Sequence, residues 1–129
     1  MLDKEVMTLA QGKNFAVLTT LLPDGQPMSH VMWVDADEEH LLINTEVHRQ
    51  KFKNISRDPR VTVTVIDASN PYLYAEVRGR VANTVKGKAA REHIDKLSDK
   101  YTGQPYDPTA ITSERVILQI VPERQRSNG

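Results

Sequence analysis

Six segments of this sequence have the residue pattern of β-strands, and helical periodicity is confined to three other places. The strand-like segments are rich in β-branched and aromatic residues and end at Gly, Pro, Asn or Asp. They cover residues 15–21, 26–34, 40–45, 61–66, 72–81 and 116–121. Apolar residues recur at helical spacing in 2–11, 48–55 and 86–100. Because strands and helices do not alternate, the order predicts a mainly β fold, a barrel of about six antiparallel strands with inserted helices.

Turn residues support antiparallel pairing and closure of this barrel. Asp24 and Gly25 stand between the first two strand segments, and Asp-Gly is a strong signal for a tight hairpin. Gly79 interrupts the long fifth segment, where a bulge or bend would let a barrel turn a corner. Pro122 follows the last apolar run and predicts the end of that strand. The six segments therefore make a meander that can curve round a single core.

Composition limits the kind of protein. Seventeen basic and seventeen acidic residues give a net charge of +0, which does not favour nucleic acid as a partner. The absence of cysteine excludes disulfides, thiolate metal ligands and cysteine nucleophiles. No apolar run approaches the roughly 18 residues of a membrane span, and the start does not resemble a signal peptide. We expect one cytoplasmic domain over residues 1–129, with a helix at 1–12, a polar tail at 123–129 and no membrane association.

The segment 41–60 has the strongest functional pattern. An apolar strand passes through Asn44 and Thr45 directly into a helix that begins with basic residues. The first backbone N–H groups of such a helix have no partner within it, and with the helix dipole they favour a bound anion. Arg49 and Lys51 would supply positive charge there. The pattern predicts a phosphate site; the alternative is a solvated basic helix on the surface.

The other polar residues give weaker signals. Three histidines lie on separate predicted elements without a cysteine partner or a second histidine one helical turn away: His40, His48 and His93. We therefore expect no metal site. His30 could act in catalysis, because imidazole as a class exchanges protons near neutral pH, but a lone histidine on a strand is more often a packed or surface residue. No serine has a nucleophile-elbow context, so the sequence identifies no catalytic residue.

Taken together, these segments resemble the flavin and deazaflavin oxidoreductases of the pyridoxamine 5′-phosphate oxidase family, whose fold is a split β-barrel of the FMN-binding type. Within that family the chain is most similar to the coenzyme F-420-dependent group. The resemblance extends from residue 15 to residue 121. It rests on residues 15–18, 24–27, 33, 49–51, 54–61, 70–72, 76–79, 93–95 and 100–101.

The resemblance implies a set of cofactor-binding residues. Arg49 and Lys51 match the positions that hold the cofactor phosphate. The strand end at Ile43, Asn44 and Thr45 would follow the ribityl chain. A second strand would border the ring system, although the family usually has a small hydroxyl residue at the position of His30 and often proline at that of Val31. The full implied set is Met28, Ser29, His30, Val31, Ile43, Asn44, Thr45, Arg49, Lys51, Asn54 and Tyr72.

The resemblance also implies an activity. Reduced coenzyme F-420 would pass a hydride to an electron-poor small molecule such as an enone, a quinone or a tetrapyrrole. The alternatives are an FMN-dependent oxidase or reductase, and a non-catalytic protein that binds a flavin or haem. We expect the acceptor pocket to be lined by the N-terminal helix and the loop 101–112. We also expect a homodimer in which Tyr72 reaches the cofactor of the partner subunit.

Overall fold

The computed structural model describes residues 1–128, which form one curved seven-stranded sheet and three α-helices. The strands are β1 (Phe15–Leu21), β2 (Pro27–Met32), β3 (Asp35–Ala36), β4 (Leu41–Glu46), β5 (Arg60–Ile66), β6 (Tyr74–Lys86) and β7 (Arg115–Asn128). The helices are α1 (Lys4–Gln11), α2 (Gln50–Arg57), α3 (Lys88–Thr102) and the short 3-10 helix η1 (Pro108–Ala110). Within the described part of the chain, no helix has the length and apolar character needed to cross a membrane.

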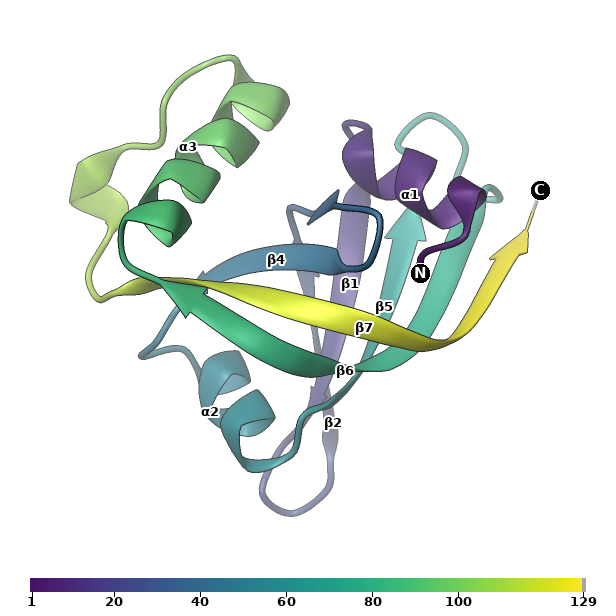
Figure 1. The fold of residues 1–129 in the computed structure, drawn as a ribbon, viewed down its shortest axis with the longest axis horizontal. Coiled ribbons are helices and arrows are strands. Elements are labelled where there is room, and N and C mark those ends of the chain that lie inside the picture. Colours follow the sequence, from purple (N-terminus) through teal and green to yellow (C-terminus); the bar gives the residue numbers. More distant parts are fainter. Residues whose placement is uncertain (129) are drawn as a thin grey trace.

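The predicted mainly β architecture is confirmed. All strand pairs are antiparallel, in the order β2-β1-β5-β6-β7-β4-β3. The two edge strands of the sheet, β2 and β3, are consecutive in sequence. The sheet curves round its core without closing, as a split barrel does (Figure 1). The strand beyond the six expected is β3. Its two residues lie in a segment that reads as an acidic turn, and they pair with Leu41 and Leu42.

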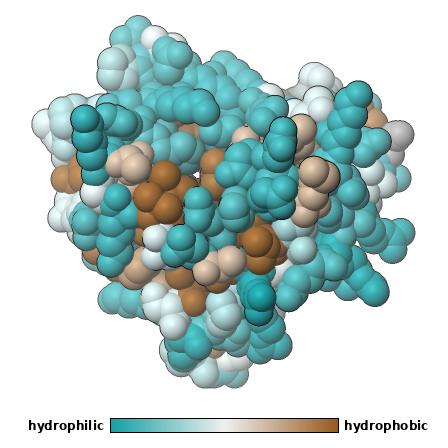
Figure 2. All heavy atoms as spheres, in the orientation of Figure 1, coloured by the Kyte–Doolittle hydropathy of each residue, from teal (hydrophilic) through white to brown (hydrophobic). Residues whose placement is uncertain are grey.

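Alternating side chains fill the inside of this barrel. In β1, in β5 and in the first half of β7, up to Ile120, every second residue is buried, which is the period of a strand with one face toward a core. Val63, Leu118 and Ile120 have no exposed surface. Helix α1 lies across one end of the barrel, where Val6 and Ala10 join the same core (Figure 1). On the outside of the molecule, hydrophilic residues dominate the face shown in Figure 2, with apolar groups near its middle.

The last strand continues past the point where we expected it to end. Strand β7 runs through Pro122 to Asn128, so residues 123–128 are not a tail; Gly129 lies outside the described residues. Pro122 is tolerated because it faces Gly79 at a shift in the β6–β7 register, where no regular ladder bond is needed. A Cβ on Gly79 would lie 2.0 Å from the Val121 carbonyl oxygen, so the bend predicted at Gly79 needs glycine.

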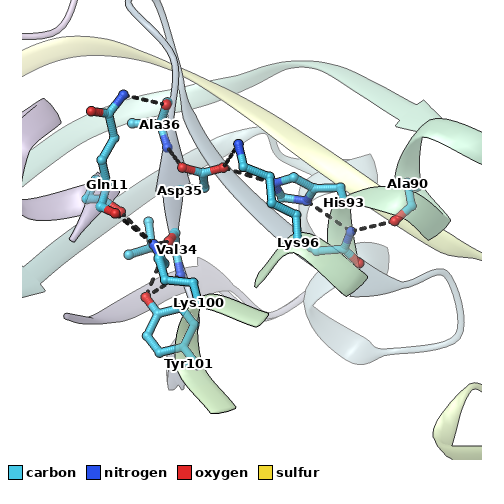
Figure 3. A network of polar contacts seen from close by, with 11 residues as sticks. Gln11, Val34, Asp35, Ala36, Ala90, His93, Lys96, Lys100 and Tyr101 are labelled. Carbon is cyan, nitrogen blue, oxygen red and sulfur yellow. Dashed lines mark hydrogen bonds and ion pairs between the residues drawn. The ribbon is translucent and has the colours of Figure 1, made fainter. Parts of the chain in front are cut away.

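Helix α3 is held against the barrel by its last turn. The Lys100 ammonium donates to the backbone oxygens of Ala10 (3.1 Å) and Val34 (2.5 Å), so it joins α3 to the end of α1 and to the segment before β3 (Figure 3). The Tyr101 hydroxyl bonds to Asn14 and to the Val34 N–H. The Trp33 and Tyr101 rings stack, with centroids 5.1 Å apart. These contacts place the buried face of α3 beside strand β4, where the site described next begins.

Candidate functional site

Three cationic side chains converge on one cavity. Arg49 precedes α2, Lys51 lies in its first turn, and Arg115 begins β7. The cavity has a volume of about 590 Å³. It is lined by Ser29, His30, Val31, Met32, Asn44, Thr45, Arg49, Lys51, Tyr106 and Arg115.

The three positive charges that line this cavity repel one another. Burial lowers the pKa of Lys51, and the positive charges of Arg49 and Arg115 lower it further. Burial is also the main cause of a lowered pKa at Arg115, whose side chain is only 9% exposed. Like charges that are gathered and partly desolvated raise the free energy of the empty site. An anion bound between them would remove that repulsion.

Arg115 is oriented by contacts on three sides. Its Nε donates to Asn44 Oδ1 at 2.8 Å, and its guanidinium lies 5.3 Å from the centre of the Tyr106 ring. Its Nη1 is 3.6 Å from Glu46 Oε2. A guanidinium with several fixed partners presents its remaining N–H groups in a defined direction. The arrangement therefore aims a positive group into the cavity.

Glu46 is the buried counter-charge of Arg115. Its carboxylate accepts hydrogen bonds from the backbone N–H groups of Thr112 (2.7 Å) and Ser113 (2.9 Å). Burial raises the pKa of Glu46, but those two bonds and the charge of Arg115 outweigh it, so the pKa lies below its usual value. Glu46 also ties the loop 103–114 to the end of β4. One carboxylate facing three cations leaves the cavity with an excess of positive charge.

Strand β2 forms another wall, and its backbone is available there. As an edge strand it pairs only with β1, so the backbone N–H and C=O groups on its other side have no ladder partner. The Val31 side chain is 68% exposed. The Ser29 hydroxyl bonds to that of Thr19 at 2.7 Å. A planar molecule with several polar atoms would find donors and acceptors along this strand.

A second, more apolar cavity continues from the first; we call it the apolar lobe. Its volume is about 240 Å³. Its lining is Val31, Met32, Trp33, Asn44, Ile94, Leu97, Tyr106 and Arg115. The Trp33 and Tyr106 rings meet edge to face, with centroids 6.2 Å apart. Because Arg115 and Tyr106 line both cavities, they mark the boundary between the cationic part and the apolar part.

The family model described as "Pyridoxamine 5'-phosphate oxidase" matches residues 2–128. The chain belongs to this family. A solved structure named "F420 Reductase" is 34% identical to the chain, with a TM-score of 0.84 over 97% of the chain and 98% of that structure. A conserved hypothetical protein from Mycobacterium tuberculosis is 27% identical (TM-score 0.78, 99% and 84% covered). General stress protein 26 from Bacillus anthracis shares the fold at 22% identity (TM-score 0.72, 97% and 92% covered). No curated protein matches the chain in sequence.

Seven of the residues expected from the family resemblance line the cationic cavity together. They come from β2, from β4 and from the start of α2: Ser29, His30, Val31, Asn44, Thr45, Arg49 and Lys51. The remaining four lie elsewhere. Ile43 has no exposed surface and points into the core, and the fully buried Asn54 side chain donates to Thr20 at 3.0 Å, so neither side chain faces the cavity. Met28 and the 77% exposed Tyr72 are outside its lining.

Three lining residues of the cationic cavity were not expected from the sequence: Met32, Tyr106 and Arg115. The only available signal for Arg115 was a charged residue at the start of an apolar strand, which is a common pattern. Tyr106 lies in a proline-rich loop whose path no local pattern fixes. The loop was expected to line the acceptor pocket, and Tyr106 does line the apolar lobe. Helix α1 was also expected to line an acceptor pocket; none of its residues lines the apolar lobe, and Val6 and Ala10 join the barrel core.

Proposed function

We propose that this protein is an oxidoreductase that binds coenzyme F-420 in the cationic cavity and reduces an electron-poor organic acceptor. The observation that carries the proposal is the convergence of Arg49, Lys51 and Arg115 on a cavity that also includes an edge strand with free backbone groups. The 34% identity to a structure named "F420 Reductase" supports the choice of cofactor. When bound in its reduced form, the deazaflavin supplies the hydride.

Each part of the cavity would hold a chemically matching part of the cofactor. Arg49 and Lys51 would bind the phosphate, helped by the free N–H groups at the start of α2. Asn44 and Thr45 would lie along the ribityl chain, and Ser29 to Val31 along the ring, which their backbone groups would orient. The two cavities adjoin at Arg115 and Tyr106, so a ring in the cationic cavity would lie next to a molecule in the apolar lobe.

The apolar lobe would hold the acceptor. Its volume is about eight times the ~30 Å³ that one water molecule occupies in the liquid, which is room for a small ring system. Aromatic and aliphatic walls favour uncharged planar molecules such as enones and quinones, or one edge of a tetrapyrrole. Arg115 would stabilise negative charge on an acceptor oxygen, and solvent would supply the proton.

Two alternatives share the same site. FMN has a similar tricyclic ring, with nitrogen where the deazaflavin has carbon, and the same ribityl chain and phosphate, so an FMN-dependent oxidase or reductase would use the same cations. A protein that only stores or carries a flavin or haem would bind without turnover. Coenzyme F-420 differs from FMN in its lactyl-oligoglutamate tail. The exposed cations that follow Lys51 in sequence, Lys53, Arg57 and Arg60, would attract that tail, adding about 0.2–1 kcal/mol per pair at low salt, although Arg60 is already paired with Asp58.

Absorbance titrations with FMN and with coenzyme F-420, each at low and high salt, test this proposal. We expect tighter binding of coenzyme F-420 at low salt, a smaller difference at high salt, and steady turnover of an enone or quinone with the reduced deazaflavin alone. Equal affinities at every salt concentration, with turnover by reduced FMN, would establish the FMN alternative. Tight binding without turnover of any acceptor would establish the storage alternative.

We also propose that the protein acts as a homodimer. Tyr72, Leu73 and Tyr74 form an exposed apolar and aromatic strip at the start of β6, with exposed fractions of 77%, 36% and 38%. Such side chains suit an isologous contact, and Tyr72 would then reach the cofactor of the partner subunit. Sedimentation at micromolar concentration should show a dimer, and the double variant Tyr72→Ser, Tyr74→Ser should shift it toward monomer. A wild-type monomer at that concentration contradicts the proposal.

A further inference from the structure

We propose that His93 and Asp35 are positioning residues, which fix the Asn44 amide and, through it, the Arg115 guanidinium. This inference rests on the proposed function, because Asn44 and Arg115 line the cavity assigned to the cofactor. Asp35, His93, Asn44 and Arg115 come from β3, α3, β4 and β7 respectively. Four separate elements thus contribute one residue each to a continuous polar chain, part of which is drawn in Figure 3.

The orientation of the Asn44 amide is fixed by the chemistry of its neighbours. Arg115 Nε can only donate, and it lies 2.8 Å from Asn44 Oδ1. The Ala90 carbonyl can only accept, and it lies 2.9 Å from Asn44 Nδ2. A flipped amide would place donor against donor at Arg115 and acceptor against acceptor at Ala90. The oxygen of Asn44 therefore faces Arg115 and its NH₂ group faces α3.

This orientation selects one tautomer of His93. Asn44 Nδ2 lies 3.1 Å from His93 Nδ1, so Nδ1 must act as the acceptor and the proton must be on Nε2. Nε2 makes no hydrogen bond within residues 1–128, and Asp35 Oδ2, at 3.5 Å, is the acceptor that it faces at ion-pair distance. Both side chains are 8% exposed. An acceptor at Asp35 is thus what keeps His93 in the form that Asn44 requires.

Asp35 is suited to remain an acceptor. Burial raises its pKa, but the His93 imidazole, the Ala36 N–H and the Lys96 ammonium outweigh burial and hold the pKa well below the usual range. Oδ1 accepts from the Ala36 N–H at 2.9 Å, and Lys96 Nζ lies 3.1 Å from Oδ2 (Figure 3). The carboxylate is therefore ionised and oriented, and it cannot offer a proton to Nε2.

The polar chain from Asp35 to Arg115 does more than pack α3 against β4, because the charges in the cavity act on Arg115. Lys51 and Arg49 repel Arg115, and a free guanidinium would turn away from them toward Glu46. The bond from Arg115 Nε to Asn44 holds the guanidinium toward the cavity instead. A polar chain of this kind is costly to bury, and an apolar group would pack α3 against β4 as well. The positioning of Arg115 explains why the polar chain is there.

The substitution Asp35→Asn tests this relay with little change in shape. The new amide can donate to Nε2, which favours the proton on Nδ1 and opposes the Asn44 NH₂ group. Asn44 then turns its oxygen toward His93 and loses its bond with Arg115. We expect ¹⁵N NMR of apo protein labelled at histidine and arginine to show His93 changing from the Nε2–H to the Nδ1–H form, with a shift of the Arg115 Nε resonance. We expect the Kd for FMN to rise about tenfold, the effect of one positioned hydrogen bond.

Two control variants separate the relay from loss of charge. Lys96→Met removes the other ion-pair partner of Asp35, and Lys96 is 73% exposed. Asp37→Asn makes the same chemical change in the partly exposed Asp37–His40 pair, whose atoms are 3.1 Å apart. Neither control should change the tautomer of His93 or the Kd for FMN by more than about twofold, since both leave in place the contacts that join Asp35, His93, Asn44 and Arg115, and the Ala36 N–H still orients Asp35.

A second substitution makes the test decisive. In His93→Asn the side-chain oxygen can replace Nδ1 as the acceptor for Asn44, so the Kd for FMN should stay within about twofold of wild type. In His93→Leu no acceptor remains, and the Kd for FMN should rise about tenfold. Adding Asp35→Asn to His93→Asn should then have no further effect on binding, a non-additive result. The proposal would be overturned if His93 kept its proton on Nε2 in the Asp35→Asn variant. It would also be overturned if Asp35→Asn weakened FMN binding equally in the wild-type and in the His93→Asn background. If wild type binds no FMN, the FMN alternative fails, and the two NMR signals still decide the relay.

Discussion

Lys51 offers a test in which stability and binding should change independently. In the folded protein its ammonium is partly buried and is repelled by Arg49 and Arg115, which is why its pKa is lowered. It has no ion-pair partner in the described structure. Replacing it with methionine keeps most of the hydrocarbon stem and removes only the charge. The apo protein should therefore not lose stability, and relief of the repulsion should raise its free energy of unfolding.

Binding of a phosphate should respond strongly to the same change. A charge-assisted hydrogen bond contributes about 1.5–3 kcal/mol, so Lys51→Met should raise the Kd for FMN by about ten- to hundredfold. The melting temperature of the apo protein, measured in a phosphate-free buffer, should correspond to a stability change within about 0.5 kcal/mol or to an increase. Fluorescence titration with FMN measures binding, and thermal denaturation measures stability.

Lys53→Met is the matched control. Lys53 lies on the same helix α2 but is exposed and does not line the cavity. FMN ends at its phosphate, so this variant should bind it with a Kd within about twofold of wild type, because screened surface charges contribute little. If Lys51→Met melts early and binds FMN normally, the basic start of α2 is structural, and the assignment of the phosphate site is wrong.

Three further results are expected. The affinity for FMN should fall as pH rises through the lowered folded-state pKa of Lys51, because only the ammonium attracts phosphate; titrations across alkaline pH should show Lys51→Arg moving this fall to higher pH. The single tryptophan, Trp33, lines the apolar lobe, so a small quinone such as menadione should quench its fluorescence saturably, and Tyr106→Ala should weaken this several-fold whereas Tyr72→Ala does not. A quench that is linear in quinone concentration would refute the lobe as acceptor site. Gly79→Ala should cost about 1–3 kcal/mol in denaturant unfolding because its Cβ would collide with the Val121 oxygen, while Gly12→Ala, facing chiefly the Asn14 side chain, should cost less.

Local sequence patterns were sufficient for most of the elements. The alternating burial of β1, β5 and the first half of β7 and the Asp24-Gly25 turn follow from short-range rules, so they could be predicted. The end of β7 could not. Pro122 normally ends a strand, and it is accommodated only because the register shift at Gly79, more than 40 positions earlier, removes the need for its N–H. A rule that considers Pro122 alone cannot include that partner.

The same distinction applies to the site. Arg49 and Lys51 are close in sequence and share the start of one helix, so their common role as cations of one cavity was predictable from their spacing. Arg115 lies 64 positions after Lys51 and reaches that cavity only because β4 pairs with β7 in a register that sets Thr45 beside Val116. His93 was considered as a metal ligand and as part of the family resemblance, and its bond with Asn44 depends on how α3 packs on β4.

The sequence by itself determined a mainly β chain, the helix that carries Arg49 and Lys51, and the family resemblance, because each of these depends on neighbours along the chain. Only the tertiary structure decided that Arg115 and Tyr106 complete the cavity and that Asp35, His93 and Asn44 form one polar chain. The physical reason is that hydrogen bonds and charge repulsion act over a few ångströms in space, whatever the separation in sequence. The packing of α3 and the β4–β7 register set those distances.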